Sequence, residues 1–172
     1  MADLPEKIED TVMAQLTGEQ RKLYLANQDR IAQQVQYREA GEFKKDKLKV
    51  LAELTKLRQI CCDPRLHYED YKAGSAKLDT CMELVRGALN GGHRILLFSQ
   101  FTGMLDIIGK RLAKEDIAFL KLTGASSKES RAKMVAQFQA GEVPVFLISL
   151  KAGGVGLNLT AADVVLSLIH IS

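Results

Sequence analysis

The sequence predicts an α/β fold, in which a parallel sheet with flanking helices follows a helical region. From residue 93 onward, short apolar runs typical of buried strands alternate with amphipathic segments. Such alternation is typical of parallel sheets with right-handed crossovers. Before residue 92 the apolar residues recur at helical spacing, and the only candidate strand there is 8–16. We therefore divide the chain into a helical region, residues 1–92, and a sheet-bearing region, residues 93–172.

Three helices are predicted in the first region, over 17–41, 45–62 and 75–90. The first begins at a predicted capping box, in which the Thr17 hydroxyl caps the helix and Gln20 reaches back to the backbone. The second carries apolar residues at spacings of three, and Pro64 ends it. These apolar residues are Leu48, Leu51, Leu54, Leu57 and Ile60. The third helix begins near Ser75.

Four strands and two helices are predicted in the second region. The strands cover 94–99, 118–122, 143–150 and 163–169, and the helices cover 101–114 and 126–141. The second of these helices opens at a predicted capping box that runs from Ser126 to Glu129. In parallel sheets, ligands bind beyond the carboxyl ends of the strands. This rule places three polar or glycine-bearing segments along one edge, namely Ser99-Gln100, Thr123-Gly124 and the loop 149–158.

The loop after the third strand is the most informative segment for function. Lys151 ends an apolar run, and Gly153, Gly154 and Gly156 follow it closely. Glycines at this density let the backbone approach a ligand, and phosphate is the usual one. A dinucleotide-binding fingerprint is the rival interpretation, but Leu159 stands where its third glycine belongs and no acidic residue follows about 20 residues later.

Composition and charge narrow the class of protein. No apolar run approaches the roughly 20 residues that a membrane span requires. The formal net charge is +3, and the segment Lys44–Arg65 holds seven basic against three acidic residues. Such a cluster fits either nucleic-acid phosphate or a solvated helix face. The three cysteines, Cys61, Cys62 and Cys81, form no C-x-x-C pair, so we expect reduced, buried thiols rather than a metal site.

A series of segments between Leu4 and Val165 carries a resemblance to a known family. They are 4–7 (LPEK), 16–24 (LTGEQRKLY), 57–64 (LRQICCDP), 75–78 (SAKL), 95–101 (ILLFSQF), 122–124 (LTG) with Arg131, and 149–163. With this set the chain resembles the second, C-terminal RecA-like lobe of Swi/Snf-type DNA-dependent ATPases, in helicase superfamily two. The segments 95–101 and 149–163 resemble the fourth and fifth helicase motifs of that family.

The resemblance implies contacts with double-stranded DNA. Ser149 and Lys151 would face DNA phosphates, Thr123 and Gly124 would hold the next phosphate, and Gln100 and Arg131 are further candidates. Each candidate has a simpler structural alternative. Arg131 would be a surface charge, Gln100 would cap the following helix, and Gly153 and Gly154 would only permit a tight turn.

The resemblance also implies ATP and Mg²⁺ as cofactors, bound mainly by a first lobe, with Gly156 and Asn158 facing the nucleotide. This chain has no Gly-Lys-Thr/Ser loop, no Asp-Glu-x-His motif and no arginine after Arg131 that would act as an arginine finger. By itself it is therefore expected not to hydrolyse ATP. We expect a fragment truncated before the sixth motif, with 167–172 including residues foreign to the family.

The function expected is that of a C-terminal lobe in an ATP-dependent translocase or remodeller of double-stranded DNA. An alternative is a non-enzymatic DNA-binding or interaction module derived from such a lobe. The expected partners are double-stranded DNA and an N-terminal ATPase lobe of the same protein, with no membrane. The expected location is the bacterial cytoplasm, with the nucleoid, or a eukaryotic nucleus.

Overall fold

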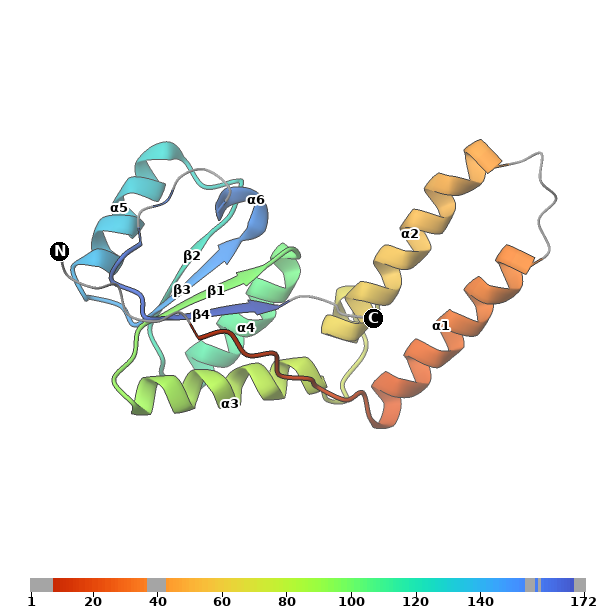
Figure 1. Ribbon diagram of the computed structural model, residues 1–172, viewed down its shortest axis with the longest axis horizontal. Helices are drawn as coiled ribbons and strands as arrows, with labels where there is room; N and C mark the ends of the chain where they lie inside the picture. The colour runs from red at the N-terminus through yellow and green to blue at the C-terminus, as the bar shows by residue number, and fades with distance from the viewer. Residues whose placement is uncertain (1–7, 37–42, 154–156, 158, 169–172) are drawn as a thin grey trace.

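The computed structural model describes residues 8–36, 43–153, 157 and 159–168. The first region is helical, as predicted, with α1 (Gly18–Gln36), α2 (Phe43–Cys62), the short 3-10 helix η1 (Pro64–Leu66) and α3 (Ala76–Asn90). Helices α1 and α2 pack as a hairpin that projects away from the sheet, whereas α3 runs along the sheet (Figure 1). Segment 8–16, the candidate strand, forms neither helix nor strand.

The second region forms the predicted parallel sheet. Its strands are β1 (Ile95–Ser99), β2 (Phe119–Leu122), β3 (Val145–Ser149) and β4 (Val164–Leu168), in the order β2-β3-β1-β4. The helices between them are α4 (Thr102–Lys114), α5 (Lys128–Gln139) and the single turn α6 (Leu150–Gly153). All strand pairs are parallel, and Ser99 lies opposite Ser149. The strand arrows in Figure 1 accordingly point the same way.

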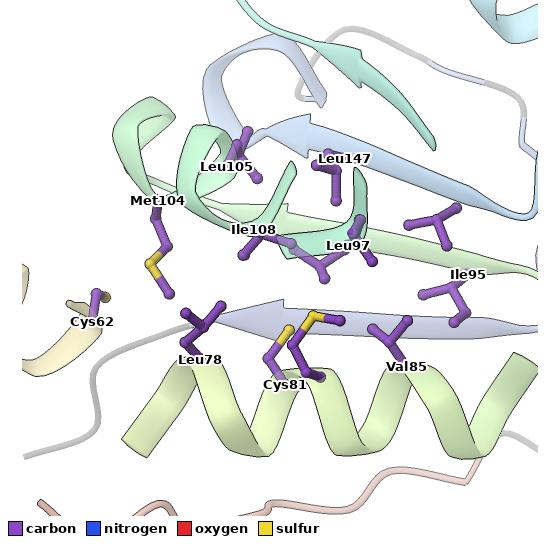
Figure 2. Close-up of a cluster of buried hydrophobic side chains, with 13 residues drawn as sticks. Cys62, Leu78, Cys81, Val85, Ile95, Leu97, Met104, Leu105, Ile108 and Leu147 are labelled. Atoms are coloured by element: carbon purple, nitrogen blue, oxygen red, sulfur yellow. The ribbon is translucent and has the colours of Figure 1, made fainter. Parts of the chain in front are cut away.

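Helices cover both faces of the sheet (Figure 1). Alternate residues of β3 divide between two cores: Val145 and Leu147 pack with α3 and α4, whereas Phe146 and Ile148 pack with Phe138 of α5. This alternation follows from the two-residue period of a strand. Figure 2 shows the first core, in which side chains of α3 point towards the strands. The α3 residues labelled there are Leu78, Cys81 and Val85.

Both predicted capping boxes are wrong in detail. The buried amide of Gln20 donates to the carbonyls of Ile60 and Cys61, so it ties α1 to the end of α2 instead of reaching back to its own helix. In α5 the cap is Ser127, whose hydroxyl accepts from the Ser130 N–H at 3.1 Å. A capping serine one residue later than predicted starts the helix at Lys128.

The predicted apolar row of α2 is only partly buried. Leu57 and Ile60 face the core, but Leu48, Leu51 and Leu54 are exposed on the projecting hairpin. The helix itself is confirmed, and the difference arises because only the C-terminal turns of α2 reach beyond the hairpin to the rest of the molecule (Figure 1).

Cys61, Cys62 and Cys81 are free and buried, as predicted for their thiols. Burial raises the pKa of the Cys81 thiol to about 12 and that of the Cys61 thiol to about 11. Both thiols therefore stay protonated at neutral pH. None of the helices that the structure describes is long and apolar enough to cross a membrane.

Candidate functional site

The described residues of the polar segments predicted to share one edge of the sheet do lie together. A hollow of about 460 Å³ opens at the carboxyl ends of β1, β2 and β3. Its lining residues are Gln100, Thr102, Asp106, Lys121, Thr123, Gly124, Ala125, Ser149 and Lys151. Five of the six predicted DNA-binding residues are among them, and only Arg131 is not. Because β2, β3 and β1 are neighbours in the sheet, the residues that follow them are brought together by the strand order alone.

Ser149 and Lys151 occupy the turn that follows β3. Ser149 is the last residue of the strand and is 3% exposed, and its hydroxyl accepts from the Ala152 N–H at 3.3 Å. This bond holds the first turn of α6 against the strand end. Lys151 is exposed within that turn, so its ammonium group is available to a ligand in the hollow.

Thr123 and Gly124 form a second tight turn after β2. The Thr123 N–H donates to the Ser126 hydroxyl at 3.1 Å, and the Ala125 N–H donates to the Thr123 hydroxyl at 3.3 Å. A Cβ atom placed on Gly124 would meet nothing within 4 Å, so the space above this backbone is open. A ligand can therefore approach the main chain here closely.

The third side of the hollow is formed by Gln100 and the start of α4. Of its residues, only Gln100 was predicted from the sequence. Gln100 precedes α4, whose N-cap residue is Phe101 with no side-chain cap, so the alternative that Gln100 caps this helix is not seen. Thr102 and Asp106 are one turn apart on α4, and Asp106 forms an ion pair with Lys121 of β2. A lysine inside the apolar run of β2 was the available sequence signal for this pair.

Arg131 has a protein partner. It lies in the first turns of α5, and its guanidinium group donates to the carbonyl of Ala152 in α6. This contact fixes, from the other side, the same turn that the Ser149 hydroxyl holds. The surface-charge alternative for Arg131 is therefore incomplete, because the side chain is half-buried and bonded to the backbone next to Lys151.

Close packing is the reason for glycine at position 153. A Cβ atom at this position would lie 2.8 Å from Cε1 of Phe98 and 3.3 Å from Cγ2 of Ile148. The backbone of α6 thus lies directly on side chains of β1 and β3. Gly154 lies outside the described residues, so its predicted turn is not tested.

None of the described side chains of the basic cluster lines the hollow. The cluster runs along α2, on the projecting hairpin (Figure 1). Within it, Arg65 pairs with the buried Asp63 at 2.7 Å, and Lys56 lies 5.6 Å from the ring centroid of Tyr68. The exposed members among the described side chains include Lys47, Lys49 and Arg58.

A second polar contact lies at the opposite end of the sheet, where β1 and β4 begin. One oxygen of Asp163 lies 2.7 Å from Nδ1 of His93, and the other accepts from the Arg94 N–H at 2.7 Å. These two hydrogen bonds lower the pKa of the Asp163 carboxyl group below its usual value. The contact joins the N-terminal ends of β1 and β4, on the far side from the hollow.

The predicted nucleotide-facing residues, Gly156 and Asn158, lie outside the described residues. Within the described part of the chain, no group of three histidine, cysteine, aspartate or glutamate residues could hold a metal ion.

Comparison with known proteins supports the family resemblance. Residues 76–168 match the helicase conserved C-terminal domain. Chromodomain-helicase-DNA-binding protein 1-like of Danio rerio is 34% identical over 96% of this chain and 17% of its own length. The chain thus spans less than a fifth of the length of the curated relatives that it matches.

Two solved structures from Sulfolobus solfataricus show the same fold. The SWI2/SNF2 ATPase C-terminal domain is 33% identical with a TM-score of 0.84, covering 94% of this chain and 72% of that one. The SWI2/SNF2 ATPase core in complex with dsDNA is 32% identical with a TM-score of 0.85, covering 96% of this chain and 35% of that one. The chain therefore belongs to the helicase conserved C-terminal domain family and has the RecA-like fold of the C-terminal lobe of SWI2/SNF2 ATPases.

Proposed function

We propose that this chain serves as the C-terminal lobe of an ATP-dependent translocase or remodeller of double-stranded DNA, and that its hollow binds backbone phosphates. The observation that carries the proposal is the convergence of Gln100, Thr123, Gly124, Ser149 and Lys151 on one hollow. A similar protein of known structure is described as in complex with dsDNA, which supports the choice of ligand.

The groups in the hollow are of the kind that bind phosphate. Lys151 supplies an exposed positive charge, and the hydroxyl groups of Ser149 and Thr123 can donate to phosphate oxygens. Gly124 supplies backbone that a phosphate can approach closely. Contacts of this kind fix the position of the DNA backbone and carry no base information. We therefore propose a grip with little sequence preference.

We assign Arg131 a supporting role in this grip. Its guanidinium group is engaged by the Ala152 carbonyl, one residue after Lys151. In this arrangement Arg131 fixes the turn that presents the lysine, so it acts on DNA through Lys151. This assignment replaces the direct phosphate contact expected from the sequence.

The proposal extends to a longer protein in which another lobe holds most of the ATP and Mg²⁺. The bound nucleotide would supply the energy for lobe closure, and Gly156 and Asn158 of this chain would face it. The described residues contribute the phosphate grip, which closure of the two lobes would tighten and hydrolysis would release. In cells such a protein would work at DNA, in a nucleoid or a nucleus.

The first test is the salt dependence of duplex binding. The affinity of this chain for a short fluorescein-labelled duplex is measured by anisotropy between about 0.05 and 0.2 M salt. Loss of one phosphate contact in Lys151→Met should weaken binding about eightfold at 0.1 M salt and reduce the salt slope by about 0.9. The matched control is Lys114→Met, at the far end of α4, which removes the same charge outside the hollow. Equal effects of the two substitutions would refute the proposed site.

The motor function needs a separate test. In the complete protein, Lys151→Met should reduce the stimulation of ATP hydrolysis by duplex DNA while leaving the basal rate at the level of Lys114→Met. A complete protein that binds DNA through this hollow without DNA-stimulated hydrolysis would instead be a non-enzymatic binding module.

A further inference from the structure

One side chain in the hollow has the wrong charge for a phosphate site. The carboxylate of Asp106, on α4, lines the same hollow as Lys121 and Lys151 and forms an ion pair with Lys121. Asp106 is 55% exposed and Lys121 is 40% exposed, so both groups are open to the hollow. The hollow therefore contains two ammonium groups and a carboxylate that already engages one of them.

The ion pair with Asp106 determines how much binding free energy a phosphate can gain from Lys121. A phosphate that binds this lysine must compete with the Asp106 carboxylate for the same ammonium group. The exchange replaces one exposed ion pair by another, so its net gain is small. The carboxylate also repels the phosphate at close range. Lys151 lies in the first turn after β3, and among the contacts that the structure describes it forms no ion pair with a carboxylate.

From this geometry we infer that Asp106 limits the affinity of the phosphate hollow, by competing with DNA for Lys121 and by repelling the incoming phosphate. The inference rests on the proposed function of the hollow and names a residue that sets its strength. A lobe that must release DNA in every cycle benefits from a site whose second lysine is only partly available. Asp106 thus sets how readily bound DNA is released, whereas Lys151 supplies the attraction.

The test is a substitution that should improve binding. In Asp106→Asn the side chain keeps its size, and Lys121 becomes free to pair with a phosphate. We expect the affinity for the labelled duplex to rise about eightfold at 0.1 M salt and the salt slope to become steeper by about 0.9, as for one added phosphate contact. A gain in affinity cannot be produced by a variant that fails to fold. The matched control is Glu83→Gln, which removes one exposed carboxylate on α3, away from the hollow.

A second pair of variants tests the mechanism. Lys121→Met should weaken binding, because it leaves the carboxylate of Asp106 unpaired in the hollow. The double variant Asp106→Asn/Lys121→Met should return to an affinity near that of the unaltered chain, since both partners of the pair are gone. The inference would be overturned if Asp106→Asn bound no more tightly than Glu83→Gln.

The outcomes separate this inference from the proposed function. If Lys151→Met weakens binding and Asp106→Asn has no effect, the hollow binds DNA but Asp106 does not limit its strength. If neither substitution changes binding, the proposed phosphate site itself is refuted. A loss of affinity in Asp106→Asn would show that the carboxylate positions Lys121 for DNA, which is the reverse of this inference.

Discussion

Arg131 offers the sharpest test of how the hollow is built, because direct contact with DNA and support of Lys151 predict different results. The perturbation is Arg131→Met, which keeps an unbranched stem and removes the guanidinium group that donates to the Ala152 carbonyl. The matched control is Lys133→Met, which removes an exposed charge from the same helix, two residues later.

The size of the effect follows from the contact. Hydrogen bonds from charged donors contribute about 1.5–3 kcal/mol, and the half-buried position of Arg131 favours the lower end of this range. The free energy of unfolding should therefore fall by about 1.5 kcal/mol. The effect on DNA binding is bounded by what Lys151 contributes, about 1.2 kcal/mol for one phosphate contact at 0.1 M salt.

A double-mutant cycle on duplex affinity distinguishes the two roles. If Arg131 acts through Lys151, Arg131→Met weakens binding in the unaltered chain but has almost no effect in a Lys151→Met background. If Arg131 contacts a phosphate directly, the two losses add, and the double variant loses about 1.8 from the salt slope. Additive losses would refute the supporting role that we propose for Arg131.

Two predictions concern stability. Because burial raises the pKa of Cys81 to about 12, the folded state keeps a proton that the unfolded chain releases above about pH 9, so this thiol should lower stability by about 1.4 kcal/mol per pH unit from there towards pH 12. Cys61, with a pKa of about 11, adds a loss of the same sign up to about pH 11. Urea unfolding at several pH values should show the combined slope, and Cys81→Ala should reduce it by about 1.4 kcal/mol per pH unit. Gly87→Ala, mid-helix in α3 with nothing within 4 Å, should stabilise the chain by about 0.5–1 kcal/mol. Gly141→Ala, at a φ of +80°, should instead destabilise it by about 1–2 kcal/mol. If both substitutions changed the free energy of unfolding in the same direction, this reasoning would be wrong.

The sheet and its helices could be predicted because their signals are local. Each strand is a short apolar run between polar turns, and each helix has an apolar stripe, so the elements were found to within a few residues. The edge that holds the hollow followed from the general position of ligands at parallel strands. The strand order in the structure, β2-β3-β1-β4, makes the three polar strand ends immediate neighbours, which is why the predicted residues meet in one hollow.

The errors arose where a side chain has a distant partner. Gln20 matches the local pattern of a capping box, but its amide bonds to Ile60 and Cys61, about 40 residues away in sequence. Asp106 and Lys121 lie 15 residues apart, on a helix and a strand, and meet only after the sheet has formed. Sequence spacing carries no information about such pairs, because the tertiary fold alone brings them together.

The geometry of the hollow also limits what this lobe can do alone. Neighbouring strands lie about 4.8 Å apart, so the ends of β2, β3 and β1 span roughly 10 Å. One DNA strand advances 3.4 Å per nucleotide along the helix axis, and successive phosphates lie further apart than this because the strand also winds around the axis, so this length can contact at most about three successive phosphates. In the proposed site, a grip of two or three phosphates, weakened further by the Asp106 carboxylate that pairs with Lys121, would give modest affinity at physiological salt. If the proposed function holds, tight but reversible binding would require a second DNA-binding surface, which the proposed partner lobe would supply.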